Sequence, residues 1–159
     1  MASTVTLDVS HSQLAVFASS LQYPFNDWTD KHVAQGFAWR PGSVSFLTLV
    51  ESGRHSIELK ISEHIGALHH DAVRAIEVPF EVPADGAIEV SSISSSAPLL
   101  LRPGRLLLRC EFLKHTDGTS ERVRLVFATR DRDRFAIVRA DKSLSTNSEL
   151  LKTAEAAIR

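Results

Sequence analysis

Apolar residues in this chain recur at every second position over five separate segments. These segments are residues 5–9, 57–61, 76–82, 106–112 and 123–127. Successive side chains on a β-strand point to opposite faces of a sheet, so each segment predicts a strand with one buried face. Turn-forming pairs such as Pro41-Gly42 and Asp85-Gly86 lie between the segments. The sequence therefore predicts an all-β protein, an antiparallel β-sandwich of jelly-roll-like type.

Two segments break this alternation and favour helices. The first lies near residues 28–35, where Asp27 or Thr29 can cap the N-terminus and Gly36 can take the left-handed position after the last turn. The second lies near residues 148–158, where Asn147 is a good N-cap residue. Five apolar residues share one face of this predicted helix: Leu150, Leu151, Ala154, Ala157 and Ile158. We expect this C-terminal helix (147–159) to pack on the outside of a single domain that comprises residues 1–159.

Size, charge and cysteine content narrow the class of protein. A chain of 159 residues with 43% hydrophobic residues can build one packed core. The net charge of −1 gives no reason to expect nucleic acid or an anionic membrane as a partner. The lone Cys110 sits in an apolar run and needs no oxidising compartment. No signal peptide and no apolar stretch of about 20 residues is present, so we expect a cytoplasmic protein.

Histidines and carboxylates gather in the polar loop 63–71. Their residue types suit zinc or another borderline metal: Glu63, His64, His69, His70 and Asp71. The spacing matches no compact ligand motif, and adjacent histidines rarely both reach one ion. We therefore predict no metal site, and we keep a small-ligand or metal-binding β-sandwich that uses this loop as the alternative function.

Catalytic motifs give little support for an enzyme. His11 lies between Ser10 and Ser12, but a hydrolase also needs an orienting group, and no Gly-x-Ser-x-Gly elbow is present. Neither glycine-rich phosphate-binding pattern occurs. Paired carboxylates depend on the fold and stay open. We predict no catalytic residue, no cofactor and no enzymatic activity, with a serine or carboxylate hydrolase as the weakest alternative.

Arginines and aromatic residues offer possible binding surfaces. In Arg130–Arg134 two aspartates interleave with three arginines, which predicts a charge-compensated loop rather than a nucleic-acid stripe. Large aromatics are mostly core residues. An exposed Trp39 beside Arg40 would nevertheless suit a protein interface, because Trp and Arg anchor such interfaces.

Three blocks near the N-terminus resemble the competence protein J family. They are Asp27-Trp28-Thr29-Asp30, Gly36-Phe37-Ala38 and Gly42-Ser43-Val44-Ser45-Phe46. Downstream, residues 78–82, 86–93 and 101–106 resemble the family in the same order, so the resemblance covers roughly residues 5–130. This family is known as the inhibitor of a DNA-entry nuclease, a sequence-nonspecific endonuclease used in competence. The resemblance therefore implies a protein that binds and blocks a nuclease, in competence or in immunity to a toxin nuclease.

A nuclease inhibitor needs a rigid scaffold and a complementary patch, and carboxylates suit a cationic DNA-binding cleft. Because the chain is close to neutral, such a patch must be local. The candidate partner-binding residues are Asp27, Trp28, Asp30, Trp39, Arg40, Glu77 and Glu81. Helix capping for Asp27 and ordinary solvation of the other carboxylates on a wet strand face are the alternatives. The oligomeric state stays open, a homo-oligomer being possible.

Overall fold

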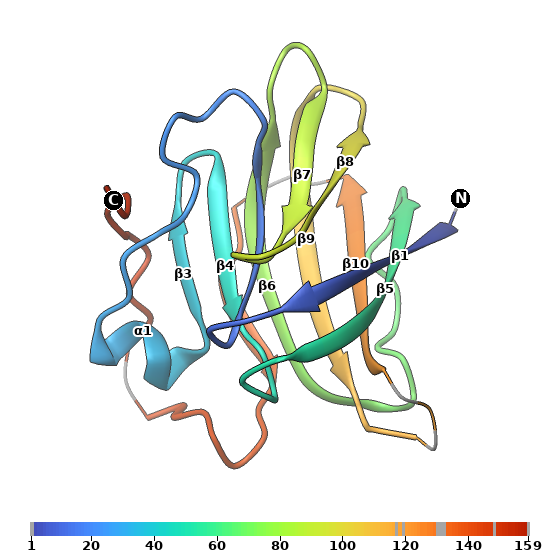
Figure 1. The fold of residues 1–159 in the computed structure, drawn as a ribbon, viewed down its shortest axis with the longest axis vertical. Helices are drawn as coiled ribbons and strands as arrows, with labels where there is room; N and C mark the ends of the chain where they lie inside the picture. The colour runs from blue at the N-terminus through green and yellow to red at the C-terminus, as the bar shows by residue number, and fades with distance from the viewer. Residues whose placement is uncertain (1, 117, 119, 130–132, 148, 159) are drawn as a thin grey trace.

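Two β-sheets packed face to face form the body of the protein (Figure 1). The computed structural model describes residues 2–158 except 117, 119, 130–132 and 148. Sheet A has the spatial order β1 (Ala2–Val9), β5 (Gly53–Ser62), β10 (Glu121–Thr129), β9 (Gly104–Leu113), β6 (Ala72–Val82) and β11 (Ala136–Arg139). Sheet B has the order β3 (Phe37–Arg40), β4 (Ser43–Leu47), β2 (Gln13–Ala18), β7 (Ala87–Ser91) and β8 (Ser96–Leu100). Neighbouring strands are antiparallel except β5 and β10, which are parallel. The predicted all-β class is confirmed.

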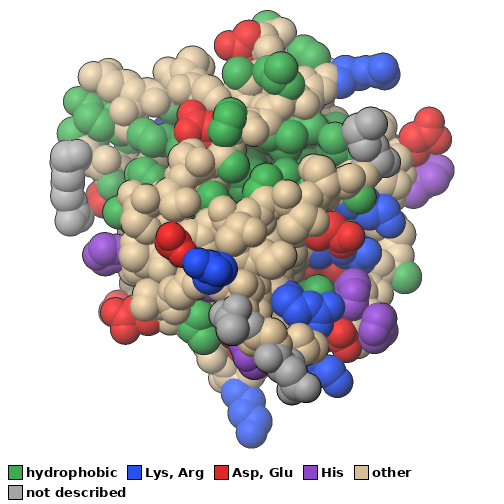
Figure 2. Space-filling model, turned by 45° about the vertical axis from the view of Figure 1, so that its right-hand side comes forward, with side chains coloured by type: hydrophobic (Ala, Val, Ile, Leu, Met, Phe, Trp, Pro, Cys, Tyr) green, Lys and Arg blue, Asp and Glu red, His purple; other side chains and the backbone are tan. Residues whose placement is uncertain are grey.

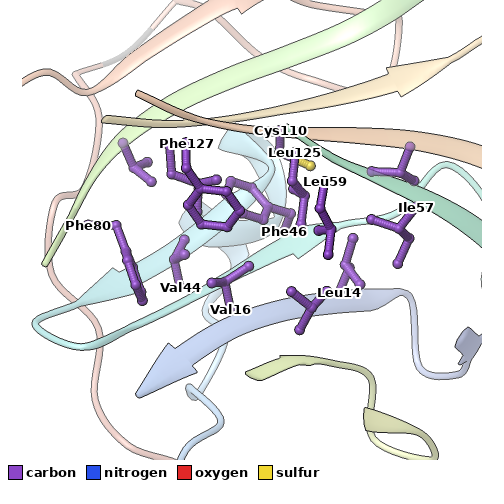
Figure 3. Close-up of a cluster of buried hydrophobic side chains, with 14 of the residues drawn as sticks. Leu14, Val16, Val44, Phe46, Ile57, Leu59, Phe80, Cys110, Leu125 and Phe127 are labelled. Atoms are coloured by element: carbon purple, nitrogen blue, oxygen red, sulfur yellow. The ribbon is translucent and has the colours of Figure 1, made fainter. Parts of the chain in front are cut away.

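The core lies between the two sheets and is built by the alternating apolar residues. Figure 3 shows Leu14, Val16, Val44 and Phe46 of sheet B facing Ile57, Leu59, Phe80, Cys110, Leu125 and Phe127 of sheet A. All ten side chains are at most 4% exposed. Burial in this apolar layer raises the pKa of the Cys110 thiol well above its ordinary value. The cysteine is thus a core residue, as its place in an apolar run predicts.

The short helix α1 (Asp30–Gln35) is confirmed, and local residues explain its bounds. The Thr29 side chain accepts a hydrogen bond from the His32 backbone N–H, and the His32 ring accepts one from the Thr29 backbone N–H, at 3.0 Å between nitrogens. Gly36 ends the helix with φ of 86°, a left-handed conformation that glycine adopts without strain. Of the two predicted caps, Thr29 is the one that the structure uses.

The predicted C-terminal helix is wrong, because described residues 149–158 are not helical. Their backbone groups bond instead to α1 and to the segment before it. Leu151 N–H donates to Gln35 Oε1 at 2.8 Å, and Gln35 Nε2 donates to the Leu151 carbonyl at 2.9 Å. Further along, Ala157 N–H donates to the Phe25 carbonyl at 2.9 Å. Tertiary hydrogen bonds thus replace the i→i+4 bonds that the apolar pattern favours. No helix in the described part of the chain is long and apolar enough to cross a membrane.

Candidate partner-binding surface

Asp27 and Trp28 lie on a segment that crosses the outer face of sheet B. Asn26, just before them, holds this segment: its Nδ2 donates to the Ala38 carbonyl at 2.8 Å and to the Ser43 carbonyl at 3.3 Å. Arg40 Nε donates to Asn26 Oδ1 at 2.6 Å, and Arg40 Nη2 donates to the Tyr23 carbonyl. Partial burial lowers the pKa of Arg40. Arg40 thus positions the segment that carries Asp27 and Trp28.

A groove opens beside this segment, and we call it the Trp28 groove. Its volume is about 570 Å³, and it is lined by His11, Gln13, Phe25, Asn26, Asp27, Trp28, Ile93 and Ala157. Trp28 is half-buried and sets its ring edge-on to His32, with ring centroids 6.3 Å apart. A second depression of about 480 Å³, whose lining includes the serine-rich segment 91–96, shares Phe25 and Ile93 with the groove. The two depressions therefore lie on either side of these shared residues.

Two polar atoms of the Trp28 groove lining have no hydrogen-bond partner among the described residues. They are Gln13 Oε1 and Trp28 Nε1, both shielded from water although their side chains are only half-buried. An unpaired buried polar atom costs roughly 1–3 kcal/mol. Ile93, also in the lining, leaves 46% of its surface exposed. The groove thus combines an apolar surface with polar groups whose bonding capacity is not used within the described chain.

The turn at the rim of the groove is strained. His11 and Ser12 connect β1 of sheet A to β2 of sheet B, and each has φ of 59°. Residues other than glycine rarely adopt this left-handed conformation, which costs roughly 1–2 kcal/mol per residue. Such strain persists where surrounding structure enforces it, and it clusters at functional sites. Here the Ser12 backbone bonds to Glu51 and Thr48, each at 2.9 Å, which fixes the turn.

Trp39 and Glu81 share a second pocket at the other side of β3. This pocket has a volume of about 380 Å³ and also contains Pro79, Pro83 and Arg105 in its lining. Trp39 Nε1 donates to the Pro79 carbonyl at 2.7 Å, and its ring meets the edge of Phe135 at 5.0 Å between centroids. Sequence analysis expected Trp39 and Arg40 to form one interface. Adjacent side chains on β3 point to opposite faces of the sheet, so the two residues lie on different sides of the strand. The indole N–H of Trp39 is already paired within the chain.

Glu77 does not lie on a wet strand face, so this part of the sequence prediction is wrong. It is 4% exposed and bonds to two arginines: Arg109 Nη1 at 3.4 Å and Arg134 Nε at 2.7 Å from its carboxylate oxygens. Glu111, also buried, bonds to Arg109 Nε at 2.7 Å and Arg124 Nε at 2.8 Å. We call these five residues the Arg109 network. Glu77 faces Arg109, and Glu111 faces Arg124, on adjacent strands, so their pairing depends on strand register, which the sequence alone does not show.

The loop 63–71 lies over this network on the outer face of sheet A. Arg109 donates to the carbonyls of Ile65, Gly66 and Ala67 at 2.9–3.1 Å, and Arg124 donates to Ala67. All five donor positions of a guanidinium group are therefore used at Arg109. The loop, predicted as polar, has no buried residue, and two arginines hold the backbone at its centre.

Histidines at the end of this loop form a group that could hold a cation. The ligand atoms of His69, His70 and Asp71 lie within 4.8 Å of one another, closer together than the sequence predicts for adjacent histidines. Asp71 already bonds to Arg122 at 3.1 Å and lies 3.9 Å from Lys114, and the Arg122 hydrogen bond lowers the pKa of Asp71. These cations compete with a metal for the carboxylate. Figure 2 shows basic, acidic and histidine side chains mixed on this side of the molecule. Metal or ligand binding here stays a prediction.

The other chemical candidates have incomplete surroundings. His11 Nδ1 lies 3.2 Å from Ser10 Oγ, but no acidic side chain orients His11 in the part of the chain that the structure describes. The pair therefore lacks the third member of a hydrolase triad. In the arginine–aspartate loop, residues 130–132 lie outside the described residues. Arg134, which follows them, belongs to the Arg109 network.

Comparison with known proteins identifies the family. The sequence model of Competence protein J (ComJ) matches residues 6–129. The chain belongs to this family. Among solved structures, ComJ from Bacillus subtilis, an inhibitor of the DNA degrading activity of NucA, superposes with a TM-score of 0.70 at 22% identity, over 80% of this chain and 96% of that chain. The product of crocagin biosynthetic gene J has a TM-score of 0.50 at 16% identity, over 82% and 98%. No curated protein matches the chain.

The region that matches the ComJ family contains the Trp28 groove almost entirely. Every residue of the groove lining except Ala157 falls within residues 6–129. Sequence analysis found Asp27 and Trp28 through the Asp-Trp-Thr-Asp block, but it missed Gln13, Phe25 and Ile93. These three residues come from distant segments, and only the packing of the 22–28 segment against sheet B brings them together. Asp30 is exposed on the first turn of α1, outside the groove lining.

Proposed function

We propose that this protein binds and neutralises a DNA-degrading nuclease of the kind that ComJ inhibits. Membership of the ComJ family is the observation that carries the proposal. The fold supports it, because two sheets with one shared core provide a rigid scaffold for a preformed binding surface. The inhibitor acts in the cytoplasm, in competence or in immunity to a toxin nuclease.

We assign the contact surface to the Trp28 groove. A half-buried tryptophan in an apolar setting is typical of interface hot spots. Asp27 and Asp30 place two carboxylates next to Trp28, and the cationic cleft that binds DNA in a nuclease attracts anions. The unpaired Gln13 Oε1 and Trp28 Nε1 offer one acceptor and one donor that a small movement would expose to a partner.

Titration of the purified protein into its cognate NucA-type nuclease tests the function. We expect DNA degradation, followed with a fluorescent duplex, to stop near one inhibitor per nuclease. Trp28→Ala should weaken inhibition at least about 30-fold, because hot-spot truncation costs about 2 kcal/mol or more. Leu100→Ala deletes a side chain that is 76% exposed on β8, and we expect it to inhibit like the wild type.

Two results would contradict different parts of the proposal. An excess of wild-type protein that leaves DNA degradation unchanged would overturn the inhibitor function itself. If instead Glu81→Gln abolishes inhibition while Trp28→Ala does not, the function stands and the contact surface is the Trp39 pocket. Circular dichroism of each variant shows whether a loss of inhibition comes from unfolding.

A further inference from the structure

The C-terminal segment 149–158, which we call the strap, is held on the body of the protein through its backbone and runs beside α1 (Figure 1). The Gln35 side chain makes two hydrogen bonds to Leu151: Oε1 accepts from the backbone N–H at 2.8 Å, and Nε2 donates to the carbonyl at 2.9 Å. Two residues further on, His32 Nε2 donates to the Thr153 carbonyl at 2.8 Å. These contacts use main-chain atoms of the strap and do not depend on its side chains.

The next two contacts of the strap continue at the same spacing. Asp27 N–H donates to the Glu155 carbonyl at 2.8 Å, and Ala157 N–H donates to the Phe25 carbonyl at 2.9 Å. An antiparallel β-bridge forms between these two bonds. Contact at every second residue is the geometry of an extended strand that is added to another element through main-chain bonds. The strap therefore binds to the body in the way that an extended peptide binds to a protein.

The side chains that hold the strap are fixed by further hydrogen bonds. His32 and Gln35 on α1 are 3% and 2% exposed. His32 Nδ1 accepts a bond from the Thr29 N–H at 3.0 Å, and Gln35 Nε2 also donates to the Phe37 carbonyl at 2.9 Å. These residues lie within 6–129, the region that matches the ComJ family, whereas the strap lies beyond it. The family region thus supplies a preformed site, and the strap is an occupant from outside that region.

The strap makes few apolar contacts with the site. None of its residues is buried. Leu150 packs partly against the core, and Lys152 Nζ lies 5.5 Å from the centroid of the Phe135 ring. Small residues fill most of its other half-buried positions: Ala154, Ala156 and Ala157. Segments with few buried apolar contacts open at low free-energy cost. A segment with larger apolar side chains at the alanine positions would bury more surface and would bind more tightly.

We propose that α1 and the segment 25–27 form a binding site for an extended segment of another protein, and that the strap covers this site as an exchangeable lid. The site recognises the main chain at alternate residues, so it accepts segments of different sequence. The incoming segment replaces the strap on Gln35, His32 and the backbone of the segment 25–27. The proposal does not depend on the nuclease-inhibitor function.

Two double proline variants of the whole chain test whether the site accepts a segment in trans. Leu151→Pro with Ala157→Pro removes the two strap N–H groups that bond to the body, which should open the strap. Thr153→Pro with Glu155→Pro is the matched control, because it keeps the bonded carbonyls and changes two exposed side chains. A fluorescein-labelled peptide of residues 149–158 is titrated into each protein, and its anisotropy is measured. It should bind the opened variant at least about tenfold more tightly than the wild type or the control, where the tethered strap competes at roughly millimolar effective concentration.

A second peptide tests recognition of the main chain. It carries alanine in place of Lys152, Thr153 and Glu155, whose side chains are exposed. We expect it to bind the opened variant within about threefold of the first peptide. Thermal melts verify that each variant is folded. Hydrogen exchange in the wild type gives an independent measure of opening: the Leu151 and Ala157 N–H groups should exchange at least about 100-fold faster than that of Leu108 in β9.

Four results would overturn the exchangeable site. One is a folded opened variant that binds neither peptide at up to about 1 mM. Another is binding of the first peptide but not of the alanine peptide, because the site would then select the sequence of the strap itself. A third is equal protection of the strap and β9 against hydrogen exchange. The fourth is a wild-type dimer that becomes monomeric in the opened variant, because the strap of a second copy would then be the occupant.

Discussion

The outer faces of the two sheets differ in how completely their buried polar groups are hydrogen-bonded. On sheet A, the Arg109 network and the loop 63–71 pair every donor of a buried guanidinium. On sheet B, Gln13 Oε1 and Trp28 Nε1 of the Trp28 groove have no partner in the part of the chain that the structure describes, and they lie beside a strained turn. Native proteins satisfy the large majority of their buried polar groups, so each exception needs an explanation. We infer that the paired polar groups on the outer face of sheet A stabilise the fold. On the outer face of sheet B, the unpaired donor and acceptor suit hydrogen bonds to a partner.

The largest expected effect comes from opening the face of sheet A. Arg109→Met leaves Glu77 and Glu111 buried with one arginine each, and removes the bonds to the loop 63–71. Breaking a buried ion pair from one side costs about 3–5 kcal/mol, so we expect the free energy of unfolding in urea to fall by about 3 kcal/mol. Inhibition of the nuclease below the melting temperature should stay unchanged, because the network faces away from the Trp28 groove.

Arg105→Met is the matched control for this prediction. Arg105 lies on the same strand and also pairs with a glutamate, but its side chain is 73% exposed. Exposed ion pairs contribute about 0–1 kcal/mol, so this variant should change stability little. Equal stability losses in the two variants would show that the buried network does not hold sheet A.

The same contrast explains what the sequence could predict. Period-two alternation identified five of the eleven described strands, all of them in sheet A: β1, β5, β6, β9 and β10. It could do so because it depends on side chains a few residues apart. Thr29 and Gly36 marked α1 through local capping rules. The buried position of Glu77 depends on its register with Arg109, 32 residues away, and was therefore missed. The C-terminal segment shows a helical pattern, yet Gln35 and Phe25 take its backbone hydrogen bonds. Long-range partners decide these cases, and no local pattern shows them.

A smaller effect of opposite sign is expected in the Trp28 groove. Gln13→Met keeps the size of the side chain and removes the unpaired Oε1, so we expect the free energy of unfolding to rise by about 1 kcal/mol. We also expect weaker inhibition of the nuclease, because stabilised functional sites often lose function. Gln22→Met, at an exposed position on the same face, should leave both properties unchanged. A destabilised Gln13→Met variant would mean that water bonds to Oε1. The outer faces of sheets A and B would then differ less in how completely their buried polar groups are hydrogen-bonded.

The smallest expected effect concerns the strained turn at the rim. Ser12→Gly relieves a left-handed conformation that costs about 1–2 kcal/mol, but it adds about 0.5–1 kcal/mol of backbone entropy in the unfolded state. We therefore expect a net gain of about 0.5 kcal/mol in urea unfolding, whereas Ser20→Gly, where φ is not positive, should lose stability. Inhibition by the Ser12→Gly variant then decides what the strain does. If inhibition weakens, the turn holds the Trp28 groove in its binding shape; if it is unchanged, the strain serves only the passage from sheet A to sheet B.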